Sequence, residues 1–201
     1  YHSVCNDFEN GIVHSKNLKN MQKAIFLDRD GTINKYVGFL RKKEEFELID
    51  GVAEAIRKIN ESGYLAIVVT NQPVIARGEV TVEELEEIHK KMETLLGDKG
   101  AYLDAIYYCP HHPHKGYEGE VSALKIDCEC RKPKPGMLLK AAEDFNIGIS
   151  QSWMIGDDEN DVKAGKAVGC RTALIGKDDF QQDVTVDSLM SWCEQFFTSK
   201  E

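Results

Sequence analysis

The sequence predicts an α/β fold in which a parallel sheet carries helices on both faces. Three features of the 201 residues lead to this prediction. Short apolar segments recur along the chain, amphipathic segments with a helical period separate them, and the total length suits one domain. Because parallel strands need a crossover connection, which a helix usually provides, this alternation predicts a parallel sheet.

The first half of the chain supplies three expected strands and two expected helices. Apolar runs predict the strands at 23–27, 64–69 and 104–108. A helix is expected at 51–61, and Gly63 stands where a helix-ending glycine usually does. A longer helix should begin after Thr81, because Thr81 and Glu84 form the sequence pattern of a capping box.

The second half continues the same alternation. Further strands are expected at 153–155 and 171–175. Helices are expected at 136–145 and 160–168, and Gly169 ends the second of them.

Composition narrows the class of protein. The net charge is −9 and hydrophobic residues make up 42% of the chain, as in many globular proteins. An acidic surface argues against a nucleic-acid partner or an anionic membrane. No apolar run approaches the roughly 20 residues that span a bilayer, and no signal-peptide pattern is visible. We therefore expect a cytoplasmic protein.

Residues 1–20 differ from the rest of the chain, because they are polar and lack periodicity. We expect a tail or the end of an upstream region, which would make the chain part of a longer fused enzyme. Packing of this segment onto the following domain is the alternative. The folded domain is expected at 21–201, and we expect it to be a monomer.

Polar side chains follow three of the expected strands. Asp28 comes directly after the first strand, Thr70 after the second, and Asp157 shortly after the strand at 153–155. Parallel α/β sheets bind ligands at the carboxyl ends of their strands. These three side chains should therefore lie together at one edge of the sheet.

The segment Asp28-Arg29-Asp30-Gly31-Thr32 has the residue types that phosphoryl transfer through a covalent intermediate requires. Asp28 can attack phosphorus as a carboxylate, and Asp30 can serve first as acid and then as base toward water. Gly31 permits a sharp turn. A Mg²⁺ ion between carboxylate and phosphate would allow the two anions to approach each other.

A simple turn or a calcium-binding loop is the alternative explanation of an Asp-x-Asp-Gly segment. A calcium loop needs further oxygen ligands at alternate positions and a distal Glu, and it follows a helix. Here no acid falls at the required place, and a strand is expected before Asp28. The catalytic interpretation is therefore preferred.

At these residues the sequence resembles the haloacid dehalogenase (HAD) superfamily of phosphohydrolases, which has a Rossmann-like fold. Segments similar to its four motifs follow in order at 28–32, 68–72, 131–133 and 155–161. The resemblance implies that Asp28 and Asp30 are catalytic. It also implies that Thr70 hydrogen-bonds the phosphoryl group and that Lys132 pairs with the phosphate and the nucleophile.

The same resemblance implies a Mg²⁺ site, with expected ligands Asp28, Asp30, Asp157, Asp158 and Asp161. The sequence leaves open whether Asp158 or Asp161 contributes. Superfamily members usually have Lys at the position of Asp158, so an additional carboxylate stands here.

Further segments resemble one branch of the superfamily, the D-glycero-D-manno-heptose-1,7-bisphosphate 7-phosphatases, with the histidinol phosphatases as near relatives. These segments lie at 28–34, 70–78, 109–113 and 128–137. The branch has a minimal cap, in which short loops replace a cap domain. The resemblance implies hydrolysis of a small phosphorylated sugar, with heptose 1,7-bisphosphate favoured and histidinol phosphate or another small phosphomonoester as alternatives.

This branch also carries a structural zinc, in a loop expected here at 109–130. The matching ligands are Cys109, His111, Cys128 and Cys130. Three thiolates and one imidazole form a normal closed zinc set, which leaves no position for substrate. His112 and His114 are rival ligands to His111. The clustering of three of the six cysteines beside histidines favours metal over disulfides in a reducing compartment.

The resemblance implies substrate contacts from Tyr36, Gly38, Phe39, Asn71, Gln72, Arg77 and Arg131. Two departures, Pro73-Val74 where the branch usually has Ser-Gly and Asp158 in place of Lys, bear on the substrate more than on the reaction. The separation of His111 from Cys128 is also longer than expected.

The sequence disfavours two other classes of function. A non-catalytic, zinc-stabilised binding module should lack Asp28, Asp30 or Lys132, and all three are present. A phosphomutase needs a larger cap that excludes water, and the short segment 34–48 leaves no room for one.

Overall fold

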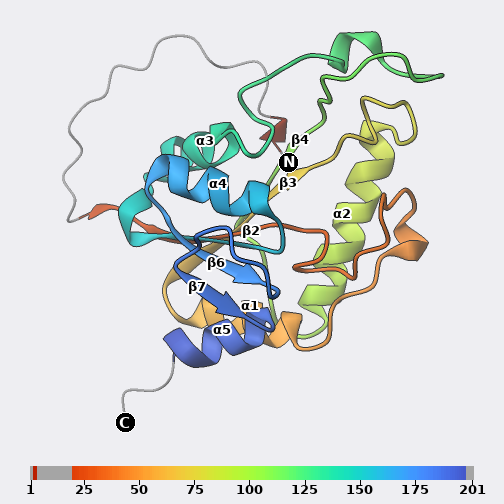
Figure 1. The fold of residues 1–201 in the computed structure, drawn as a ribbon. Coiled ribbons are helices and arrows are strands. Elements are labelled where there is room, and N and C mark those ends of the chain that lie inside the picture. The colour runs from red at the N-terminus through yellow and green to blue at the C-terminus, as the bar shows by residue number, and fades with distance from the viewer. Residues whose placement is uncertain (1, 4–19, 198–201) are drawn as a thin grey trace.

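The computed structural model describes residues 2–3 and 20–197, which form a parallel sheet covered by helices on both faces (Figure 1). Residues 1 and 4–19, on which most of the expected tail falls, lie outside the described part of the chain. Within the described part, no helix is both long and apolar enough to cross a membrane.

The sheet has seven strands in the described residues, in the order β1-β4-β3-β2-β5-β6-β7. Each neighbouring pair is parallel, which confirms the expected sheet type. The strands are β1 (His2–Ser3), β2 (Lys23–Leu27), β3 (Tyr64–Asn71), β4 (Ala105–Cys109), β5 (Trp153–Gly156), β6 (Arg171–Ile175) and β7 (Val184–Val186).

Helices cover the sheet in two layers (Figure 1). Side chains of α1 (Val52–Glu61), α2 (Val82–Gly97) and α5 (Leu189–Phe196) share one buried apolar cluster. Those of α3 (Gly136–Phe145) and α4 (Glu159–Val168) belong to a second cluster. Short 3-10 turns complete the fold at η2 (Lys43–Glu45), η3 (Ser122–Leu124) and η4 (Ile149–Gln151).

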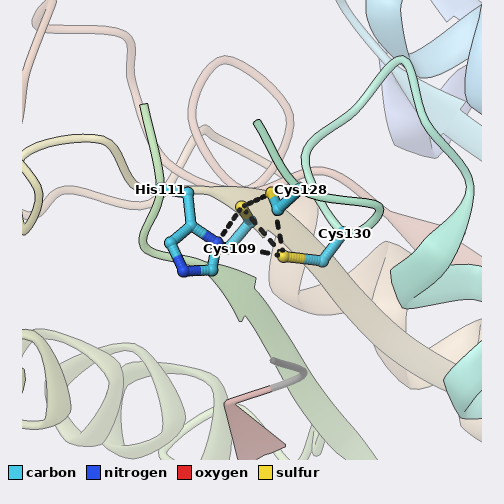
Figure 2. Close-up of side chains that lie close together, drawn as sticks. All are labelled: Cys109, His111, Cys128 and Cys130. Carbon is cyan, nitrogen blue, oxygen red and sulfur yellow. Dashed lines mark hydrogen bonds between the residues drawn. The ribbon is translucent and has the colours of Figure 1, made fainter. Parts of the chain in front are cut away.

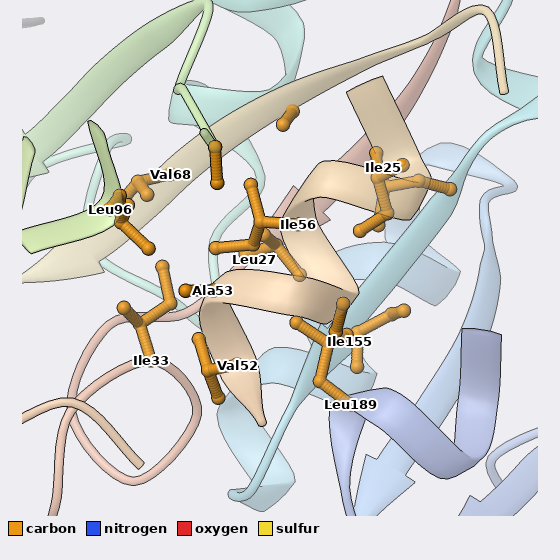
Figure 3. Close-up of a cluster of buried hydrophobic side chains, with 14 of the residues drawn as sticks. Ile25, Leu27, Ile33, Val52, Ala53, Ile56, Val68, Leu96, Ile155 and Leu189 are labelled. Atoms are coloured by element: carbon orange, nitrogen blue, oxygen red, sulfur yellow. The ribbon is translucent and has the colours of Figure 1, made fainter. Parts of the chain in front are cut away.

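The central strand β2 divides its side chains between these two clusters. Ile25 and Leu27 pack toward α1 and α5 (Figure 3), whereas Ala24 and Phe26 belong to the cluster on the other face. A strand with both faces buried must be apolar throughout, and the alternation follows from the pleat. The carboxyl end of β2 is thus fixed from both sides.

Most expected elements are confirmed within one or two residues. The capping box is present, with the Thr81 side chain accepting from the N–H of Glu84 at 3.1 Å. The strand expected at 64–69 continues to Asn71, so Thr70 lies inside β3 rather than after it. The sequence patterns did not predict the short strands β1 and β7, nor the helix α5.

Candidate active site and metal sites

Three neighbouring strands bring the expected site residues to one edge of the sheet. Strand β2 pairs with β3 on one side and with β5 on the other. Asp28 follows β2, Thr70 lies near the end of β3, and Asp157 follows β5. A pocket of about 320 Å³ opens at this edge, with Asp28 and Asp157 in its wall.

A cluster of three carboxylates lies at the base of this pocket. Oxygen atoms of Asp28, Asp157 and Asp161 all lie within 4.8 Å of one another. Two glycines allow this close approach. A Cβ at Gly31 (φ +80°) would collide with the Asp157 carboxylate, and one at Gly156 would collide with that of Asp161.

The ammonium group of Lys132 joins two members of the cluster. Its Nζ donates to Oδ1 of Asp28 at 2.8 Å and to Oδ1 of Asp161 at 2.6 Å. Although burial favours the neutral amine, Asp161 and Asp28 raise the pKa of Lys132 above its usual value. Lys132 is therefore a buried cation at the point where the nucleophile is expected.

The carboxylates of the cluster are short of positive charge. Burial, followed by the charge of Asp161, raises the pKa of Asp28 to about 7. Burial, followed by the charge of Asp28, raises the pKa of Asp157 to about 6. Carboxylate oxygens are the ligands that Mg²⁺ prefers, and a divalent cation would supply the missing charge. The residues present fit such an ion.

Asp158 and Asp30, which the resemblance also implied as Mg²⁺ ligands, direct their side chains elsewhere. The Asp158 carboxylate caps helix α4 by accepting from the N–H of Asn160 at 2.6 Å. The Asp30 carboxylate is engaged by Arg29. The geometry thus brings Asp161 rather than Asp158 into the carboxylate cluster.

Asp30 is held by three side chains. Nη2 of Arg29 lies 2.8 and 3.0 Å from its two carboxylate oxygens. Asn34 donates to Oδ1 at 3.0 Å, and Gln72 donates to Oδ2 at 2.9 Å. Burial opposes ionisation, but Arg29 and these hydrogen bonds hold the pKa of Asp30 below its usual value. The carboxylate is thus fixed in orientation and favoured as the anion.

Residues of the second motif also organise the site. The amide of Asn71 donates to the carbonyl of Lys132 and accepts from its N–H, both at 3.0 Å. The Gln72 amide donates to Thr70 Oγ1 at 3.0 Å besides Asp30. Asn71 and Gln72 were expected to contact substrate, and both line the pocket. Their hydrogen bonds show that they also position Lys132 and Asp30.

Of the other expected substrate contacts, all but Arg77 line the pocket, and Arg77 contacts one of the lining residues. Tyr36, Gly38, Phe39 and Arg131 line the pocket. The guanidinium of Arg77 stacks 4.2 Å from the centre of the Phe39 ring. The unexpected Pro73 also lines the pocket, whereas Val74 is buried beneath it.

The four expected zinc ligands form a second cluster (Figure 2). The Sγ atoms of Cys109, Cys128 and Cys130 lie 3.1 to 3.5 Å apart. Nδ1 of His111 lies 3.8 Å from the sulfur of Cys109 and 3.6 Å from that of Cys130. Sulfur ligands of tetrahedral zinc, with bonds of about 2.3 Å, are roughly 3.8 Å apart. The cluster is close to this spacing and fits a zinc ion.

The structure distinguishes His111 from its rivals. Burial lowers the pKa of His111 and also that of His112, so the pKa does not separate these two and their contacts do. The neighbouring His112 instead accepts from the N–H of His114 through Nδ1 and lies against the Tyr117 ring. Of these histidines, only His111 belongs to the ligand cluster found in the described residues.

The Cys/His cluster is adjacent in sequence to the candidate active-site residue Lys132. Cys130 immediately precedes Arg131 and Lys132, and Arg131 donates to the carbonyl of His111 at 3.3 Å. The loop also contacts the segment that follows the second motif, because the N–H of Val121 donates to the carbonyl of Ala76 at 2.9 Å. An ion bound here would fix the segment that carries Lys132.

Sequence reasoning did not assign roles to Arg29, Asn34 and His89. Arg29 and Asn34 bracket Asp30, and His89 contacts Arg29 from helix α2. A signal existed for Arg29 alone, since a charged residue between two motif acids at a buried strand end requires a partner. His89 stands among apolar residues of a helical stripe and carries no such signal.

Comparisons with known proteins agree with this geometry. The family described as HAD-hydrolase-like matches residues 129–189. A D-glycero-beta-D-manno-heptose-1,7-bisphosphate 7-phosphatase of Pasteurella multocida is 44% identical over 157 residues, which are 78% of this chain and 83% of the relative. The Escherichia coli K12 protein of that name is 44% identical over 152 residues, or 76% and 78% of the two chains.

Solved structures are similar as well. The D,D-heptose 1,7-bisphosphate phosphatase from B. bronchiseptica, complexed with magnesium and phosphate, has a TM-score of 0.75 and 29% identity, covering 87% of this chain and 98% of its own. The Burkholderia thailandensis structure of the same description has a TM-score of 0.65 and 26% identity, covering 89% and 100%.

The fold and the site define a phosphatase of the HAD superfamily, which confirms the resemblance noted in the motifs. Within that superfamily, the chain belongs to the family of the D-glycero-beta-D-manno-heptose-1,7-bisphosphate 7-phosphatases.

We predict that Cys128→Ser releases zinc and loosens the loop. Zinc per chain should fall from about one to well below it, and KM should rise about tenfold because the Arg131-Lys132 segment loses its anchor. Metal analysis, melting temperature and steady-state kinetics measure this. Cys193→Ala is the matched control, since this buried thiol packs near α1. Unchanged zinc content and kinetics in the Cys128 variant would contradict the assignment.

Proposed function

We propose that this chain is a Mg²⁺-dependent 7-phosphatase of a heptose 1,7-bisphosphate that acts through a phospho-aspartate on Asp28. The observation that carries the proposal is the bridge from Lys132 to Asp28 and Asp161 within a cluster of three carboxylates. If Lys132 served only a structural role, one carboxylate would be enough as its ion-pair partner. The third acid leaves the cluster short of positive charge. A bound metal ion would supply that charge and would also bind the phosphate of the substrate.

In the first half-reaction, Asp28 attacks phosphorus and the sugar oxygen departs. Lys132 keeps the nucleophile oriented and offsets charge on the phosphoryl oxygens. Thr70 is buried at the end of β3, where its hydroxyl can donate to the phosphoryl group. Asp30 donates the proton that the leaving oxygen requires.

In the second half-reaction, Asp30 accepts a proton from the water that attacks the phospho-aspartate. Arg29 favours the carboxylate form of Asp30, which suits this step. Asn34 and Gln72 hold the carboxylate in one orientation while its protonation changes. Hydrolysis then regenerates Asp28 and releases inorganic phosphate.

A bound Mg²⁺ would be held by Asp28, Asp157 and Asp161, and it would neutralise the phosphate so that an anionic nucleophile can approach. Zinc would be held by Cys109, His111, Cys128 and Cys130, with no open position for chemistry. Both proposals rest on donor types and spacing that fit these ions.

The heptose bisphosphate is favoured because relatives with 44% identity over most of the chain carry that name. The site offers suitable groups for a second phosphate. Arg131 lines the pocket, and Arg77 stacks on the lining residue Phe39. A guanidinium binds phosphate in a bidentate manner. Histidinol phosphate, a monophosphate, would leave such a group without a partner.

We predict that a panel of phosphomonoesters ranks the heptose 1,7-bisphosphate first by kcat/KM. Loss of the second phosphate should reduce kcat/KM by at least about tenfold, because a charged hydrogen bond contributes about 1.5–3 kcal/mol. The panel includes the heptose 7-phosphate, histidinol phosphate and simple hexose phosphates, with phosphate release as the measurement. A higher kcat/KM for histidinol phosphate would overturn the substrate proposal and leave the reaction type intact.

Asp28→Asn should reduce kcat by at least about a thousandfold while the fold and the zinc content persist, because the amide cannot form the phospho-intermediate. Phosphate release, melting temperature and metal analysis test this. Intact-mass detection of a phosphoryl group in the wild-type protein, absent from the variant, would support the nucleophile assignment. Substantial Mg²⁺-dependent turnover in the variant would refute it.

Asp161→Asn should raise the Mg²⁺ concentration for half-maximal activity by about tenfold, because it removes a charge from the cluster. Asp158→Asn is the matched control. Asn caps helices as well as Asp does, so α4 keeps its first turn and the Mg²⁺ requirement should change by less than about threefold. Titration of activity with Mg²⁺ separates the two variants. A larger effect at position 158 would assign the metal to Asp158.

A further inference from the structure

The buried side chain of His89 contacts Arg29, the ion-pair partner of Asp30, and has itself no role in the reaction as described above. Arg29 follows the proposed nucleophile in sequence, yet its side chain is completely buried and does not line the pocket. His89 is also completely buried, on the inner face of α2. Nη1 of Arg29 lies 3.2 Å from Nε2 of His89. This contact joins a helix to the segment that contains the reacting carboxylates.

The direction of this hydrogen bond follows from elementary chemistry. A guanidinium has five N–H donors and no acceptor. Nε2 of His89 must therefore accept, which places the ring proton on Nδ1 and makes the imidazole neutral. Burial, followed by the charge of Arg29, holds the pKa of His89 well below its usual value, which agrees with this state.

The guanidinium of Arg29 is thereby held on two sides. Its Nη2 faces both oxygens of Asp30, and its Nε lies 3.3 Å from Oδ1 of the same carboxylate. Its Nη1 is held by His89. A guanidinium is planar, so a hydrogen bond at Nη1 fixes the plane in which Nε and Nη2 meet the carboxylate. Loss of the acceptor on α2 would leave a buried N–H donor and allow the plane to turn.

We propose that His89 is a positioning residue for phosphoryl transfer, whose Nε2 holds the Arg29 guanidinium in the orientation that fixes the carboxylate of Asp30. The proposal rests on the proposed function, because it gives His89 its effect through the acid–base residue. It predicts an effect on the chemical steps rather than on substrate binding, since His89 and Arg29 do not line the pocket.

The test compares three substitutions at one position. In His89→Gln the amide oxygen can reach about the place of Nε2 and accept from Arg29. In His89→Asn the same amide is one methylene shorter and falls short of it. His89→Leu has no acceptor. We expect Asn and Leu to lower kcat by about tenfold or more with KM changed less than about twofold, whereas Gln retains kcat within about threefold.

A second readout separates positioning from general loosening of the fold. With p-nitrophenyl phosphate the leaving group needs no proton, so phosphorylation of Asp28 should stay fast in His89→Asn while hydrolysis of the phospho-aspartate slows. Stopped-flow absorbance should then show a burst of about one nitrophenolate per enzyme, followed by slow turnover. Ile88→Val, on the neighbouring buried position of α2, is the control for packing and should show no burst.

The outcomes are decisive in either direction. The proposal is overturned if kcat of His89→Asn and His89→Leu stays within about twofold of wild type. It is also overturned if His89→Gln is as slow as His89→Leu, or if the burst and the steady-state rate of His89→Asn slow equally. If Leu fails to fold, the Gln and Asn pair still decides. Wild-type turnover is measured first, because its absence refutes the proposed function itself, whereas normal turnover with unchanged variants refutes only the role of His89.

Discussion

The ammonium group of Lys132 lies between Asp28 and Asp161, at 2.8 and 2.6 Å, and the Lys132 side chain is only 3% exposed. An ammonium ion removed from water to this degree is several kcal/mol less stable unless opposite charges compensate it. The two carboxylates face the same requirement. Each of the three buried charges is therefore stable only when the other two are present, so the three side chains must come together during folding. They come from the end of β2, the third motif and the start of α4, so only the completed sheet unites them.

Two features hold the Lys132 backbone where this contact needs it. The Asn71 side chain, at the end of β3, bonds both the N–H and the carbonyl of Lys132. The Cys130 thiol, two residues earlier, belongs to the Cys/His cluster that could hold a metal ion. The loop at 109–130 contains little regular structure, so ordering this loop is entropically unfavourable. Metal binding to four preassembled side chains offsets such a cost. Zinc bound at this cluster, as we propose, would therefore help to hold Lys132 in place.

Sequence patterns predicted the sheet and the acids at the strand ends, because both depend on local chemistry that periodicity and spacing reveal. The resemblance to the family indicated the four side chains that form the Cys/His cluster. Neither could choose between Asp158 and Asp161, since both acids follow the same strand. The choice is made by the helix: the residue at the cap turns to the free N–H groups, and the residue three positions on turns into the cluster.

The contact between Arg29 and His89 was also beyond sequence reasoning, because it joins positions sixty residues apart. In the sequence, His89 is one member of an apolar stripe. Only the packing of α2 against the end of β2 gives it a charged neighbour. Helix α5 was missed for a related reason. Its apolar residues, such as Leu189 and Trp192, form a short segment whose helical state depends on packing against α1.

In the proposed reaction, Asp30 carries a proton in one half-reaction and accepts one in the other, and its surroundings favour one of these two states. Arg29 favours the anion, so the proton-accepting state is the stable one in the free protein. A bound phosphomonoester brings negative charge close to Asp30, which opposes Arg29 and favours protonation. Departure of the sugar removes part of that charge. In this scheme, the arrival and departure of substrate drive the protonation cycle, and the Arg29 guanidinium restores the base form for the attack by water.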